Sequence, residues 1–166
     1  MEIQMVLYLP RDAASVPVSR QVLDGCLQTL GVTSDTRADI ALALDEACAN
    51  VVQHAGAGEE YEVQVSARNG RCAIEVLNTG TADGAPLPED GIGGSSGPGR
   101  AGRWIAATGD PVPLTAEHGR GLRIIDAVTD NLQLTGNDRH GLSVRFEKAL
   151  AWLPDAPGRH LFGPGD

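Results

Sequence analysis

Apolar residues follow two different periods in the first third of the chain, and these periods predict its first three elements. Residues 3–9 favour a short strand, which Pro10 would close. Apolar positions at three- and four-residue steps then predict helices over 16–30 and 34–54. Gly31 stands where a glycine commonly ends a helix, so we expect the two helices to be separated there.

The rest of the chain alternates between strand-like runs and one further helix. Residues 61–65 and 72–76 alternate apolar and polar side chains, and the Asn-Gly pair at 69–70 between them predicts a hairpin turn. A helical pattern starts after Gly121 and continues to about residue 128. A last hairpin is predicted from the apolar residues at 132–134 and 142–146. Because hairpins give antiparallel neighbours, this order predicts an α/β two-layer sandwich: a mostly antiparallel sheet with helices on one face.

Two segments lack regular periodicity. Residues 79–117 are rich in Gly, Pro, Ser and Asp, and a loop of this length in a compact domain is typical of a lid, a binding loop or a disordered insert. Residues 151–166 contain three prolines and predict a flexible C-terminal tail. We therefore expect one domain over 1–150, followed by the tail.

Composition and charge narrow the class of partner. The chain has 13 Lys and Arg against 22 Asp and Glu, a formal net charge of −9. An acidic surface repels the phosphate backbone, so direct binding of nucleic acid is not expected. No apolar run approaches the roughly 20 residues that a membrane span needs. The 3 cysteines are far apart and form no CxxC motif, which favours reduced thiols and a cytoplasmic location.

The second predicted helix carries a polar stripe. Glu46, Asn50 and His54 are spaced four residues apart and share one side of the helix. A carboxylate and a carboxamide are hard oxygen ligands of the kind that Mg²⁺ takes together with phosphate oxygens. A carboxylate there could also orient or deprotonate a nucleophile. A solvated polar face would give the same spacing, so the helix alone does not decide.

Glycines near two element ends add a second feature. Gly80 follows a predicted strand, and Gly119 and Gly121 stand where the next helix is expected to open. Paired glycines at a helix N-terminus let the backbone approach a phosphate, although turns use the same pattern. The Gly-Lys-Ser/Thr sequence of a Walker motif is missing.

Taken together, these motifs resemble a known family. Residues 43–55, ALDEACANVVQHA, closely resemble the N-box of the histidine-kinase-type (Bergerat-fold, GHKL) ATPases. Residues 78–80 stand in place of the family's adenine-reading Asp-x-Gly, 118–122 resemble its second glycine box, and 141–146 resemble its closing strand. The resemblance runs over residues 3 to 148, and within the family it points to bacterial anti-sigma-factor serine/threonine kinases.

The resemblance implies roles for individual residues. Asn50 would be the magnesium ligand, and Glu46 would be the general base for an acceptor hydroxyl or would hold an attacking water. Gly80 would admit the adenine ring, Gly119 and Gly121 would cradle the triphosphate, and 79–117 would form the ATP lid. The nucleotide-binding residues implied are Asn50, Asn78, Gly80, His118, Gly119, Arg120, Gly121 and Leu122.

The implied function is a cytoplasmic, ATP- and Mg²⁺-dependent transferase that regulates transcription. It would sequester a sigma factor and phosphorylate a serine or threonine of a STAS-domain anti-anti-sigma protein; homodimerisation is left open. Three departures support an alternative, a binding module that regulates a partner by contact alone. Asn78 replaces the family's Asp, Ala82 replaces a glycine of the first glycine box, and Glu117 stands where some relatives carry Arg.

Overall fold

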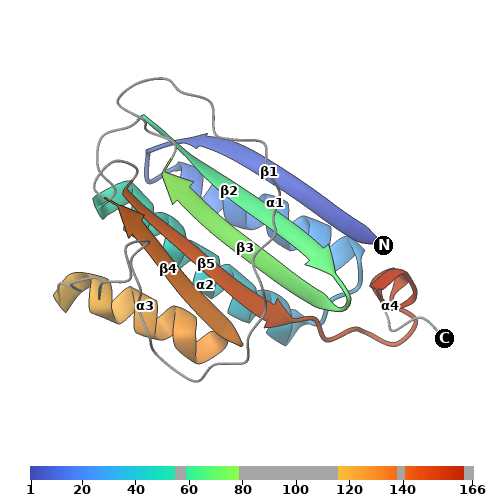
Figure 1. The fold of residues 1–166 in the computed structure, drawn as a ribbon. Helices are drawn as coiled ribbons and strands as arrows, with labels where there is room; N and C mark the ends of the chain where they lie inside the picture. Colours follow the sequence, from blue (N-terminus) through green and yellow to red (C-terminus); the bar gives the residue numbers. More distant parts are fainter. Residues whose placement is uncertain (55–58, 79–115, 138–140, 163–166) are drawn as a thin grey trace.

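A five-stranded sheet forms one layer of the molecule (Figure 1). The computed structural model describes residues 1–54, 59–78, 116–137 and 141–162. Every strand pairs antiparallel with its neighbours. In spatial order the strands are β1 (Glu2–Pro10), β2 (Glu60–Arg68), β3 (Arg71–Asn78), β5 (Gly141–Ala149) and β4 (Asn131–Asn137).

Three helices cover one face of this sheet: α1 (Ser15–Thr29), α2 (Ser34–His54) and α3 (Ala116–Val128). The central helix, α2, packs against α1 on one side, against α3 on the other, and against β3 and β5 of the sheet. The predicted α/β sandwich with an antiparallel sheet and helices on one face is therefore confirmed.

The core lies between the two layers, because strand side chains alternate across the sheet. In β2, Tyr61 and Val63 point inward and are fully buried, and in β5 Val144 and Phe146 do the same. The apolar stripe of α2 meets them with side chains that are at most 1% exposed: Ile40, Leu44, Ala47 and Val51. The apolar face of the strands and the apolar face of α2 thus pack against each other in one core.

Helix α3 begins earlier than the sequence indicated. We expected it to open after Gly121, but it starts at Ala116, so both Gly119 and Gly121 lie inside it. A glycine costs a helix interior roughly 1 kcal/mol relative to alanine but does not end the helix, and packing on α2 offsets that cost. The predicted lid therefore loses its last two residues, 116 and 117, to α3. Its remaining residues, 79–115, lie outside the described residues.

The predicted flexible tail is wrong for residues 151–162. Trp152 forms an isolated antiparallel β-bridge with Val32, which lies between α1 and α2. Helix α4 (Pro157–Phe162) follows. The rings of Trp152 and Phe162 stack with their centroids 6.1 Å apart, and Phe162 is only 2% exposed. The prolines suggested disorder, but the two aromatic rings bury enough apolar surface to hold the segment on the domain. Residues 163–166 lie outside the described residues.

Candidate functional site

Two polar residues of α2 face the glycine-bearing helix α3. A Cβ atom added to Gly121 would lie 2.7 Å from Glu46 Oε2 and 3.5 Å from both Oδ1 and Nδ2 of Asn50. Glu46 and Asn50 are one turn apart on α2, so one short stretch of α3 touches both side chains. The structure thus brings together three of the residues singled out in the sequence.

Asn50 is buried in an unusual way for an amide. Its residue is 6% exposed, and its Nδ2 atom finds no hydrogen-bond partner among the described residues. An unsatisfied buried polar group costs about 1–3 kcal/mol, and such groups are often found where a ligand binds. An amide also offers an oxygen for a hard cation beside an N–H donor for a phosphate oxygen. Asn50 therefore fits a cation–phosphate ligand.

Asp45, the neighbour of Glu46, points to the other side of α2. Its Oδ2 atom accepts from Arg20 Nη1 on α1 at 2.6 Å, forming an ion pair between the two helices. Sequence patterns do not predict this contact, because residues 25 positions apart meet only once the two helices are packed. Of the two consecutive carboxylates, only Glu46 is directed at α3.

Asn78 ends β3 with a side chain that is 9% exposed. It is in register with Tyr61 and, by strand alternation, shares the helix-facing side of the sheet with Val76 and Ile74. The end of β3, the end of α2 and the start of α3 all lie toward the same end of the sandwich, at the left in Figure 1. Asn78 is therefore at the same end of the sandwich as the last turn of α2, which follows Asn50. Gly80 lies outside the described residues.

The second glycine box differs from expectation, because its glycines do not precede a helix. His118 and Gly119 belong to the helical backbone of α3, and Arg120 is exposed on it. Leu122 is fully buried and contributes its side chain to the hydrophobic core. This segment thus contributes Gly121, which lies close to Glu46 and Asn50, and Leu122, which packs in the hydrophobic core.

The thiol groups near the site are unreactive core residues. Burial raises the pKa of Cys48, which lies two residues beyond Glu46, to about 12, so this thiol is protonated at neutral pH. Its Sγ atom lies 3.8 Å from Ser19 Oγ, and the nearby Tyr61 hydroxyl shares a 2.8 Å hydrogen bond with Ser15 Oγ. Cys72 is likewise buried with its pKa raised to about 12. All 3 cysteines are free, and Cys26 is exposed.

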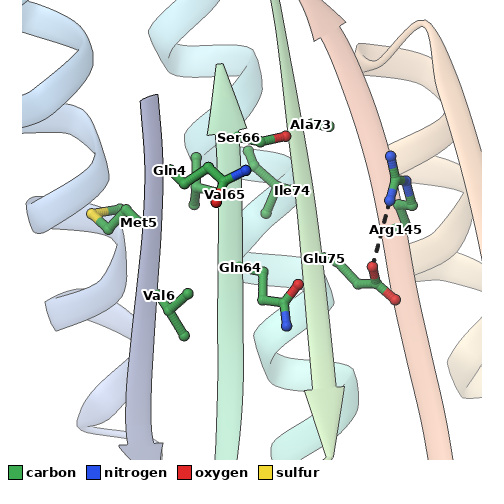
Figure 2. A pocket seen from close by; sticks show the side chains of 10 residues that line it. All are labelled: Gln4, Met5, Val6, Gln64, Val65, Ser66, Ala73, Ile74, Glu75 and Arg145. Atoms are coloured by element: carbon green, nitrogen blue, oxygen red, sulfur yellow. Dashed lines mark ion pairs between the residues drawn. The ribbon is translucent and has the colours of Figure 1, made fainter. Parts of the chain in front are cut away.

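A shallow depression on the opposite face of the sheet is separate from this site. Figure 2 shows Gln4, Gln64 and Ser66 lining it, with Glu75 paired to Arg145 at one side. These side chains come from the strand positions that point away from the helices. The depression holds neither Glu46 nor Asn50. In the part of the chain that the structure describes, no helix is long and apolar enough to cross a membrane.

Comparison with known proteins places this arrangement in a family. Residues 9–148 match the model of the histidine kinase-like ATPase domain. The chain is 25% identical over 144 residues to the serine-protein kinase RsbW of Bacillus mycoides, a match covering 86% of this chain and 82% of that protein. It is 26% identical over 146 residues to the RsbW of Bacillus velezensis, with the same shares covered. The family match covers β2, β3, β4 and nearly all of β5, together with Glu46 and Asn50 of α2 and the glycines of α3. The chain therefore belongs to the histidine kinase-like ATPase domain family.

Proposed function

We propose that the chain is an ATP- and Mg²⁺-dependent serine/threonine kinase that controls transcription by sequestering a sigma factor. Its substrate would be a serine or threonine of a STAS-domain anti-anti-sigma protein. One observation carries the proposal: Glu46 and Asn50 converge on Gly121 between α2 and α3, with the Asn50 amide buried and one of its atoms unpartnered among the described residues. The similarity to serine-protein kinases supports phosphoryl transfer as the activity.

Asn50 and Glu46 have separate tasks in this proposal. Asn50 presents its side-chain oxygen to the cation and its N–H to a phosphate oxygen. Bound Mg²⁺ supplies neutralisation of the phosphate charge. Glu46 accepts the proton of the incoming hydroxyl, whose oxygen forms a bond to the γ-phosphorus while the bond to the leaving ADP oxygen breaks. The products are the phosphorylated hydroxyl, ADP and a protonated carboxyl.

The remaining site residues are assigned to nucleotide contacts. Asn78 and Gly80 would meet the adenine ring, and His118, Gly119, Arg120 and Leu122 would border the phosphates through α3. Arg120 is exposed, so its guanidinium can reach a phosphate oxygen without leaving a buried partner behind. We place the protein in the cytoplasm, where ATP and sigma factors are found.

A second candidate function follows from one residue. Asn78 is buried and uncharged where the family carries Asp, so the adenine contact lacks charge assistance. A protein with a weakened adenine site could act as a binding module that regulates its partner by contact, with nucleotide as a gate. The two functions differ in one measurable quantity, the phosphate transferred per nucleotide bound.

Glu46→Gln tests the kinase directly, because it keeps the shape of the side chain and removes the base. We expect the variant to keep Mg-ATP and partner binding but to lose transfer by about 10²–10⁴-fold, the usual contribution of a general base. The assay uses radiolabelled ATP and the STAS protein captured from native lysate, with wild type alongside. If wild type transfers no phosphate to that protein, the kinase proposal fails and the binding-module function stands.

A further inference from the structure

We infer that Gly121 is a positioning residue: the side chain it lacks leaves the space in which the Glu46 carboxylate sits. This inference deepens the proposed function and rests on it for its catalytic consequence. The resemblance gave Gly121 a different task, cradling the triphosphate. The two tasks predict different results when a methyl group is added at this position.

The backbone of α3 does not itself need a glycine here. Gly121 lies beyond the first four residues of the helix, and its φ is outside the left-handed range that favours glycine. Only the first four N–H groups of a helix are left without intrahelical partners, so that of Gly121 is used within α3. Alanine is also the better helix former. A reason for the glycine must therefore come from what surrounds it.

The nearest group to the space beside Gly121 is the Glu46 side chain. A Cβ on residue 121 would lie 2.7 Å from Glu46 Oε2, closer than non-bonded carbon and oxygen atoms approach. The same Cβ would lie 3.5 Å from both polar atoms of Asn50, an ordinary van der Waals distance. A methyl group would thus conflict with the carboxylate and fit beside the amide.

The conflict has a cheap solution that moves only the carboxylate. Oε2 is the far end of a flexible side chain, and Glu46 is only half-buried, so rotation about its side-chain bonds would clear the space. The fold would be kept while the base left its place. Because a misplacement of about 1 Å can cost about a hundredfold in rate, the absent side chain matters to transfer more than to binding.

Gly121→Ala tests this, with Gly25→Ala as the matched control. Gly25 also lies in a helix, and a Cβ there would meet nothing within 4 Å. We expect Gly121→Ala to keep its affinity for Mg-ATP within about threefold and to slow transfer by at least about tenfold. Gly25→Ala should change neither. If Gly121→Ala weakens Mg-ATP binding more than about tenfold and slows transfer only through that loss, Gly121 is a phosphate cradle and the inference is overturned.

A second measurement keeps the inference testable if the kinase proposal fails. The thermal midpoint of Gly121→Ala is compared in the wild-type and Glu46→Ala backgrounds, without nucleotide. We expect the added methyl group to raise the midpoint more once Glu46 is trimmed, because the conflict has been removed. Equal shifts in both backgrounds would mean that the two positions do not interact, which would overturn the inference whatever the activity of the protein.

Discussion

Asn50 and Glu46 stand one helical turn apart, yet their surroundings differ in a way that decides what each can do. Among the described residues Asn50 is buried with an unpartnered amide nitrogen, whereas Glu46 is half-buried and its carboxylate lies against Gly121 of α3. A buried amide contributes little to the fold on its own, so its removal should affect binding more than stability.

Asn50→Ala should weaken Mg-ATP binding at least about tenfold, since it removes a metal ligand. Its free energy of unfolding should change by less than about 1 kcal/mol, because the lost packing is offset by the loss of an unsatisfied amide. Calorimetric titration with Mg-ATP and urea unfolding measure the two quantities. A variant that binds Mg-ATP as tightly as wild type would mean that the metal is held elsewhere.

Asn78→Asp addresses the adenine contact. Restoring the family's carboxylate should strengthen ATP binding by up to about tenfold, the size of one charge-assisted hydrogen bond. Because the position is 9% exposed, the new charge should lower stability in the nucleotide-free protein. Titration with ATP and GTP measures affinity and base selectivity together. Weaker ATP binding would show that the pocket is built around the amide.

At the level of elements, α3 is anchored at the end away from its glycines. Lys148 on β5 donates to Asp39 Oδ2 of α2 at 2.7 Å and to the Val128 carbonyl at 2.6 Å, where α3 ends. The ammonium group thus links α2, α3 and the sheet. Its positive charge also interacts favourably with the negative C-terminal end of the α3 dipole. This contact fixes the end of the helix whose interior carries Gly121 beside Glu46.

Lys148→Met should therefore lower the free energy of unfolding by about 1–2 kcal/mol, since the side chain is only 19% exposed and two acceptors lose their charged donor. Lys148→Arg keeps the charge and should recover part of the loss. Urea unfolding of the three proteins at neutral pH gives the comparison. If the methionine and arginine variants are equally stable, the charge at this position does not hold α3.

The elements show how far the sequence can be interpreted. Among the described residues, alternation and helical periods predicted each strand and the three long helices, because both patterns come from the burial of one face. The start of α3 and the packing of residues 151–162 were missed, since both depend on surfaces supplied by distant residues, α2 for the one and Val32 for the other. In the candidate site, the four-residue spacing predicted only that Glu46 and Asn50 share one side of α2. The contact of Gly121 with the Glu46 carboxylate required the packed helices.

Across the whole molecule, three ionisable groups are enclosed in one hydrophobic core. Burial raises the pKa values of Cys48, Tyr61 and Cys72 to about 12, from ordinary values of 9.0 for the thiols and 10.0 for the phenol. In the unfolded chain these groups regain their ordinary values. Above pH 9 the unfolded state therefore releases protons that the native state still holds, and stability falls as pH rises toward 12.

The expected result is a free energy of unfolding that declines steadily between pH 9 and pH 11 in urea unfolding experiments. Cys72→Ala removes one of the three groups, and burial alone accounts for the raised pKa of that thiol. The variant should be less stable at pH 7 because of the lost packing, but it should lose less stability than wild type between pH 7 and pH 11. Equal losses in the two proteins would mean that Cys72 is not titrating in this range.

The packed C-terminal helix has a practical consequence for experiments that need the protein attached to a support. Both ends of the described chain, Met1 and α4, lie at the right in Figure 1, whereas the start of α3 lies at the left. A tether joined at either end is therefore at the opposite end of the sandwich from the end of α2 and the start of α3. Protein immobilised through its ends would leave the end of α2 and the start of α3 facing the lysate from which a partner is to be captured.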